Sequence, residues 1–141
     1  MSDADEPEKK ARQLIDNALK DACCEIQDYK TANPFGSKGV AIEYFQMGQG
    51  VGEADYVLFV NGLAVGVVEA KPIGETLTGK EFQTKRYAEG FPKDFRYVEL
   101  PLPFVYESNG NETRFTNLWD PKPRSREVFS FHKPEIFEEW V

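Results

Sequence analysis

The sequence contains one histidine, two cysteines and no long apolar run. A single histidine, His132, excludes zinc sites built from several histidines and nucleases that use a histidine pair, and without a partner motif it is expected to be structural. The cysteines, Cys23 and Cys24, are adjacent, which argues against a structural disulfide and favours a cytoplasmic location. No apolar segment approaches the roughly 20 residues that a membrane-spanning helix needs, so no membrane partner is expected.

The charge balance is acidic. Seventeen basic residues against 24 acidic ones give a net charge of −7, which argues against a protein that coats nucleic acid by bulk attraction. It leaves room for a small catalytic face, because carboxylates that hold a metal are themselves acidic. Positive charge is local and forms two groups, one of Lys80, Lys85 and Arg86 and one of Lys122, Arg124 and Arg126. Most such groups are solvated faces, so they give weak support for nucleic-acid binding.

A chain of 141 residues fits one domain with its own core. Apolar residues recur at three- and four-residue steps from residue 11 to residue 26 and predict a helix, whose first turn contains Pro7. Apolar, β-branched segments then predict strands at 40–45, 55–60 and 63–71, the last two joined by a hairpin at Asn61-Gly62. Because both hairpin strands are apolar on both faces, they are expected in the middle of a sheet covered by helices.

The second half of the chain continues the alternation. A capping box at 78–81 predicts a helix that ends at Gly90. Strands are expected at 103–107, 113–116 and 128–131, and a helix from Pro134 onwards. The predicted fold class is therefore α/β, with a central mixed β-sheet flanked by helices. We expect a disordered tail at 1–6, a domain at 7–135, and at 136–141 the start of a helix or linker to a further part of a longer protein.

Two charged residues end an otherwise apolar strand. Glu69 and Lys71 are two residues apart and share one face. Burying an acid and an amine is costly unless they pair or bind a metal, so the pattern fits either a structural ion pair or a functional site. Any hydrolysis by this chain must use such carboxylates and lysine, with a metal as their expected partner.

Asp55 opens the partner strand, and the hairpin register decides whether it meets Glu69. With a strictly two-residue loop, Asp55 would face Val68, and the two acids would project from opposite sides of the sheet. With a three-residue loop at 60–62, Asp55 would lie opposite Val67, with Glu69 diagonally adjacent and both within reach of one cation. A site therefore requires this second register or an equivalent bulge.

Such a cluster suits phosphodiester hydrolysis. Asp55 and Glu69 would hold one or two Mg²⁺ ions, which prefer oxygen ligands. The metal would lower the pKa of a bound water, and Lys71 would orient or deprotonate that water and stabilise the transition state. Glu53 is a weaker candidate for an outer ligand. A glycosidase that pairs Glu69 with Glu53 is a poorer alternative, because it leaves Lys71 without a role.

At this point the residues resemble a known family. Asp55 followed by Glu69-Ala70-Lys71 resembles the Asp…Glu-x-Lys signature of PD-(D/E)xK nucleases, and Gln83 with Tyr87 resembles the Gln-x-x-x-Tyr motif of their RecB-like branch. The flanking segments resemble the N-terminal region of the R (restriction, motor) subunits of type I restriction-modification enzymes: residues 11–16, 27–29, 103–108 and 120–126. Together they cover about residues 7 to 135.

The resemblance implies a restriction-endonuclease-like core and the activity of a type I site-specific deoxyribonuclease. Members cut double-stranded DNA after an ATP-driven motor, C-terminal to this domain, has moved along the duplex, and they work with methylation and specificity subunits. ATP would serve only the full-length subunit, since this chain has no Gly-x-x-x-x-Gly-Lys-Ser/Thr motif.

Carried over onto this chain, the family roles fall on a short list of residues. Asp55 and Glu69 would hold Mg²⁺, and Lys71 would be the catalytic lysine. The residues expected to contact DNA or brace the site are Gln83, Tyr87, Lys80, Lys85 and Arg86. Cys23-Cys24 departs from the family, where many members have a glycine and a bulky aromatic, and this bears on packing. The alternative is an inactive nuclease fold that docks DNA or partner subunits without cutting.

Overall fold

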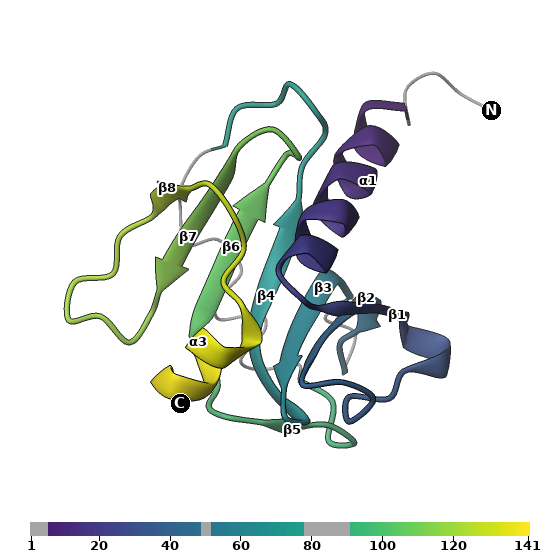
Figure 1. The fold of residues 1–141 in the computed structure, drawn as a ribbon, viewed down its shortest axis with the longest axis vertical. Coiled ribbons are helices and arrows are strands. Elements are labelled where there is room, and N and C mark those ends of the chain that lie inside the picture. The colour runs from purple at the N-terminus through teal and green to yellow at the C-terminus, as the bar shows by residue number, and fades with distance from the viewer. Residues whose placement is uncertain (1–5, 49–51, 78–90) are drawn as a thin grey trace.

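The chain forms one mixed β-sheet with helices against it (Figure 1). The structure, a computed structural model, describes residues 6–48, 52–77 and 91–141. Along the chain the described elements are α1 (Glu6–Asp21), β1 (Glu25–Asp28), the 3-10 helix η2 (Tyr29–Thr31), β2 (Gly39–Gln46), β3 (Glu53–Val60), β4 (Leu63–Ala70), β5 (Arg96–Tyr97), β6 (Phe104–Ser108), β7 (Thr113–Asn117), β8 (Arg126–Val128) and α3 (Pro134–Trp140).

The predicted hairpin strands lie in the middle of this sheet. The strand order is β1-β2-β3-β4-β6-β7-β8, and the short β5 pairs with β4 beside this path. β4 runs parallel to β6, and β1 runs parallel to β2, while the remaining pairs along the path are antiparallel. Gly66 allows β6 to approach, because a Cβ at this position would lie 2.3 Å from the Phe104 carbonyl oxygen. The expected mixed α/β sheet is confirmed.

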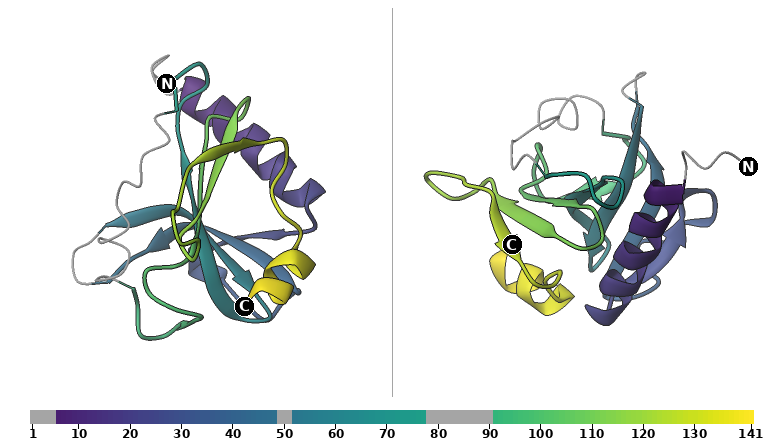
Figure 2. Two further views of the ribbon diagram at one scale, coloured as in Figure 1. Left: turned by 90° about the vertical axis from the view of Figure 1, so that its left-hand side faces the viewer. Right: turned by 90° about the horizontal axis from the view of Figure 1, so that it is seen from above.

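The two faces of the sheet carry separate apolar clusters. Helices α1 and α3 cover one face, where Ile15 and Leu19 of α1 and Phe137 of α3 are buried with side chains of the central strands (Figure 2). Residues after 135 therefore contribute to the same core as the rest of the domain. The opposite face holds an aromatic group in which Phe45 contacts the rings of Tyr29, Phe59, Phe91 and Phe95.

The first helix ends earlier than predicted. It ends at Asp21 because Cys23 adopts the left-handed conformation, with a φ of 70°. The Cys24 N–H then donates to the Leu19 carbonyl and the Cys23 N–H to the Lys20 carbonyl, at 3.0 and 2.9 Å, as in a Schellman helix end. Cys23 occupies the position where such ends favour glycine. Both cysteines are free thiols. Cys23 is exposed, and Cys24 is buried.

Several edge elements differ from the prediction. The last strand is Arg126–Val128 rather than 128–131, because the chain turns inward after it and buries Phe131. β1 and β5 were not predicted, since both are short and lack an apolar alternation. Of the tail expected at 1–6, residues 1–5 lie outside the described residues, and Glu6 begins α1. The helix expected at 78–90 also lies outside the described residues. No helix in the described ranges is long and apolar enough to cross a membrane.

Candidate active site

The β3–β4 hairpin brings Asp55 and Glu69 opposite each other. Val60 pairs with Leu63, so the loop has two residues, and the three-residue loop, one of the two arrangements that would suit the site, is absent. The register shifts between Leu58 and Phe59, because β4 contains one extra residue, Val65, that pairs with nothing on β3. This is the equivalent bulge that the hypothesis allowed.

The bulge moves the register by one residue along the rest of the hairpin. Tyr56 pairs with Val68, and the same register continued by one residue places Asp55 opposite Glu69. Without the extra residue Asp55 would face Val68. Asp55 thus lies at the position opposite Glu69 rather than Val68, where the two strands part.

The Asp55 carboxylate lies where β3 and β4 part. Beyond the Tyr56–Val68 pair, the Ala70 N–H donates to Asp55 Oδ2 at 2.8 Å, so a side-chain oxygen accepts the bond that a β3 carbonyl would otherwise accept. Ala70 joins Glu69 to Lys71. The aspartate carboxylate is therefore bonded to the backbone of the residue that separates the other two candidate site residues.

Arg12 of α1 holds the other side of this aspartate. Its guanidinium donates to Asp55 Oδ1 at 3.1 Å and to the Asp55 carbonyl at 3.3 Å, and it lies 3.8 Å from a carboxylate oxygen of Glu43. Its Cζ is 4.2 Å from the ring centroid of Tyr44 and 4.9 Å from that of Tyr56. The pKa of Arg12 is raised: burial opposes its charge, but the surrounding tyrosines and carboxylates favour it by more.

Tyr44 adopts an unusual backbone conformation to make this contact. Its φ is 54°, the left-handed region that costs a non-glycine residue about 1–2 kcal/mol. The ring is partly exposed and lies over the Arg12 guanidinium. The Tyr56 hydroxyl donates to Asp16 at 2.6 Å. Arg12 therefore contacts two aromatic rings and two carboxylates, which together hold its guanidinium towards Asp55.

A second buried carboxylate adjoins Glu69. Glu107 on β6 pairs with Glu69 across the parallel strands, and the two residues are only 5% and 9% exposed. Keeping two adjacent carboxylates charged out of water requires nearby positive charge. Sequence reasoning missed Glu107, although it ends the apolar segment 104–106 much as Glu69 ends β4, and this shared feature could have identified it.

Lys71 follows Glu69 at the same edge of the sheet. Its backbone N–H donates to the Ser108 carbonyl at 2.8 Å, so the pairing with β6 continues beyond the end of β4. Extended backbone keeps Lys71 on the face of Glu69, and its side chain is half-buried. Lys71 thus follows the two paired glutamates at the same end of the sheet.

The candidate donor atoms at this strand end are carboxylate oxygens, the ligand type that magnesium prefers. Among the described residues no group of three or more His, Cys, Asp or Glu side chains could hold a metal ion. Magnesium does not need such a group, because it keeps several waters and binds proteins through one or two carboxylates. A cavity of about 230 Å³ opens beside Asp55 and is lined by Glu8, Lys9, Arg12, Tyr44, Glu53 and Asp55. Glu53 accepts a 2.8 Å hydrogen bond from Gln46 there.

The structure describes His132 but not the residues that were expected to contact DNA. His132 contacts the Tyr106 hydroxyl through Nδ1, and its backbone N–H donates to the same oxygen at 3.1 Å, which agrees with a structural role. The residues expected to contact DNA or brace the site, Gln83, Tyr87, Lys80, Lys85 and Arg86, lie outside the described residues.

The fold defines a mixed α/β domain in which helices flank one β-sheet. A solved structure described as a fragment of a proposed HsdR subunit of a type I restriction enzyme from Vibrio vulnificus YJ016 matches with a TM-score of 0.62 and 21% identity. The match covers 99% of this chain and 25% of that one, so the chain spans about a quarter of the relative's length. The comparison with curated protein sequences finds no match.

The family is shown by the sequence itself. Residues 3–124 match the family described as the type I restriction enzyme R protein N terminus. The chain belongs to this family.

Proposed function

We propose that the chain is the Mg²⁺-dependent endonuclease domain of a type I restriction enzyme R subunit, which hydrolyses phosphodiester bonds of double-stranded DNA. One observation carries the proposal. In a member of this family, Asp55 lies opposite Glu69 and accepts a hydrogen bond from the backbone N–H between Glu69 and Lys71. Two acids and an amine at one strand end are the donor set that metal-assisted phosphodiester hydrolysis needs.

Asp55 and Glu69 would hold the ion. Each Asp55 oxygen accepts one hydrogen bond, from Arg12 or from Ala70, and each retains a lone pair for a cation. Both bonds fix the carboxylate before the ion arrives, which lowers the cost of ordering it. Glu69 supplies the second carboxylate from the neighbouring strand. When bound, Mg²⁺ would lower the pKa of a coordinated water and neutralise charge on the scissile phosphate.

Lys71 supplies the remaining chemistry. Its ammonium, on the face of Glu69, can orient the attacking water and stabilise the negative charge that builds on the phosphate oxygens in the transition state. As an amine it could also accept a proton from that water. Lys71 is therefore the residue whose neutralisation should leave the carboxylate pair intact and remove turnover.

The wider context is part of the proposal. Cleavage would follow ATP-driven movement along DNA by motor domains of the same subunit, within a cytoplasmic complex that also contains methylation and specificity subunits. Family membership and coverage of about a quarter of a related chain support this arrangement. The domain alone should cut DNA poorly, because a net charge of −7 gives little affinity for the duplex.

The test uses the R subunit that carries this domain, assembled with its partner subunits. Asp55→Asn, Glu69→Gln and Lys71→Ala should each abolish DNA cleavage while ATP-driven translocation and the circular dichroism spectrum stay unchanged. Glu127→Gln, which neutralises an exposed acid on the outer strand β8, is the matched control and should cut normally. Cleavage by any of the three site variants would instead favour a module that docks DNA or subunits without cutting.

A further inference from the structure

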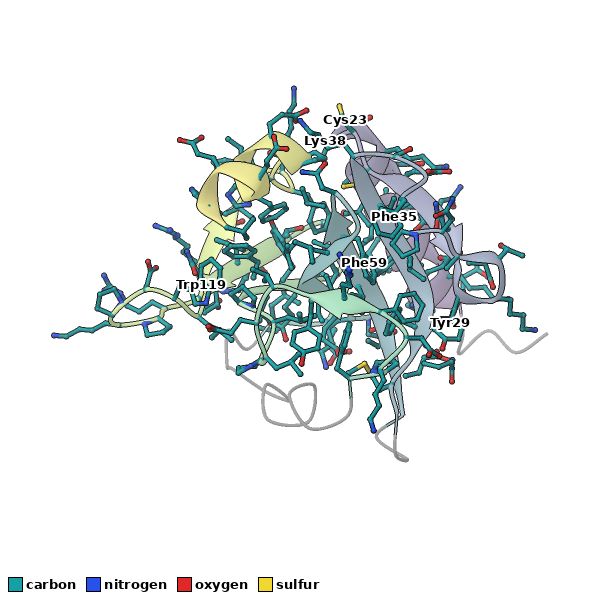
Figure 3. The ribbon with its side chains drawn as sticks, turned by 90° about the horizontal axis from the view of Figure 1, so that it is seen from below. Cys23, Tyr29, Phe35, Lys38, Phe59 and Trp119 are labelled. Carbon is teal, nitrogen blue, oxygen red and sulfur yellow. The ribbon has the colours of Figure 1, made fainter. Side chains whose placement is uncertain are left out.

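A basic loop projects from the outer edge of the sheet, between β7 and β8 (Figure 3). It surrounds a cavity of about 560 Å³ lined by Asp120, Pro121, Lys122, Arg124, Ser125 and Arg126. Three of these residues are cations and one is a carboxylate, in a chain whose net charge is −7. The local charge is thus opposite in sign to that of the molecule.

The loop is anchored at both ends. Where it leaves β7, the Trp119 indole N–H donates to Glu99 at 2.8 Å and its ring contacts Phe104, with centroids 5.3 Å apart. Where it enters β8, the Arg114 guanidinium donates to the Ser125 hydroxyl oxygen at 2.8 Å and to the Ser125 carbonyl at 3.1 Å. Prolines at 121 and 123 restrict the backbone between these anchors. The backbone that carries the cations is therefore restrained at both ends and between them.

Among the residues that the structure describes, no ion pair links the three cations to a protein anion. In the described part of the chain the ion pairs involve Arg12, Lys38 and Arg114, and none includes Lys122, Arg124 or Arg126. All three side chains are exposed. Arginine forks match phosphate oxygens in a two-bond geometry, and lysine adds a point charge. The ligand class that fits is a phosphate-bearing backbone.

We propose that the loop formed by residues 120–126 binds the sugar-phosphate backbone of duplex DNA. The inference rests on the proposed function, because it assigns a second contact to the same substrate. The carboxylates at the strand ends of β3, β4 and β6 repel DNA until a cation neutralises them, so affinity has to come from elsewhere on the domain. β8 is separated from the β3–β4 hairpin by β6 and β7, so the loop would hold phosphates other than the one that is cut.

The magnitude follows from counterion release. Each neutralised phosphate contributes about 0.9 to the slope of log affinity against log salt concentration. Three contacts predict a contribution of about 2.7, so removing them should flatten the slope by that amount. Because backbone contacts carry no base information, the loss should be equal for duplexes of unrelated sequence.

The experiment measures the binding of the 141-residue chain to a labelled duplex by fluorescence anisotropy, from low to moderate salt, with chelator present and no divalent metal. The triple variant Lys122→Gln, Arg124→Gln and Arg126→Gln should bind at least about tenfold more weakly at the lowest salt, with the flattened slope. The matched control Lys20→Gln, Lys30→Gln and Lys93→Gln removes the same charge from exposed positions elsewhere and should change the slope by less than about one.

Three results would overturn the proposal: no binding by the unmodified chain at low salt, an unchanged slope in the loop variant, or an equal loss in the control. Matching urea unfolding midpoints check that both triple variants are folded. Since the assay contains no metal and measures binding alone, its result does not depend on whether Asp55, Glu69 and Lys71 cut DNA. A failure of the nuclease proposal would therefore leave this result standing, and the two can be told apart.

Discussion

The contact between Arg12 and Asp55 should contribute measurably to folding stability as well as to the site. The two side chains are 13% and 25% exposed, and their charged groups lie 3.1 Å apart. Exposed ion pairs contribute about 0–1 kcal/mol, whereas hydrogen bonds to charged groups in sheltered positions contribute about 1.5–3 kcal/mol. The rings of Tyr44 and Tyr56 favour the second class, because their contacts with the guanidinium reduce the entropy cost of holding it.

A double-mutant cycle isolates this contact. Arg12→Met keeps a side chain of similar length beside the rings of Tyr44 and Tyr56. Asp55→Asn keeps an oxygen acceptor for the Ala70 N–H. The coupling between the two substitutions should be about 2 kcal/mol. Arg12→Met alone should cost about 3 kcal/mol, because it leaves both Asp55 and Glu43 without their cation.

Urea unfolding of the four proteins, followed by circular dichroism at neutral pH, gives the coupling directly. It should persist in 1 M salt, where the screening length shrinks to about 3 Å and exposed pairs lose their effect. A coupling below about 0.5 kcal/mol, or one that disappears in salt, would show that Arg12 is an ordinary surface partner and does not fix the aspartate.

Two further predictions concern the helix end and the histidine. Cys23→Gly should raise the free energy of unfolding by about 0.5–1 kcal/mol, because glycine avoids the cost of the left-handed φ of 70°, while Cys23→Ala, which keeps a Cβ, should give no gain in urea unfolding. Burial, together with the charge of Arg126, lowers the pKa of His132, so folding favours neutral imidazole and should lose stability as the pH falls below the ordinary value of 6.5. His132→Asn should remove this component, and equal losses between pH 8 and 5.5 in variant and unmodified chain would contradict it.

The sequence predicted the central hairpin well because two independent signals agreed there. Apolar residues marked the strands, and Asn61-Gly62 marked a tight turn whose left-handed conformations the structure contains at φ 51° and 82°. The pairing register of the two strands beyond the turn could not be predicted from the sequence. Val65 has the β-branched character of its neighbours, and only the packing of both faces selects it as the bulged residue.

Sequence analysis missed Arg12 and Glu107 for a different reason. Arg12 lies 43 positions before Asp55, and a helix surface arginine carries no local sign of the strand it will contact. Glu107 did carry a sign, an acid after buried aromatic positions, but its place beside Glu69 depends on the parallel pairing of β4 with β6. Short edge elements such as β1 and β5 are set by pairing with longer strands and leave no periodic pattern.

The most direct test of the account is a crystal of the chain soaked in Mn²⁺, with anomalous difference density measured at the manganese absorption edge. We expect a peak coordinated by carboxylate oxygens of both Asp55 and Glu69, and its loss in the Glu69→Gln variant. An absent peak, or one bound by either acid alone, would contradict a shared metal at the end of the hairpin.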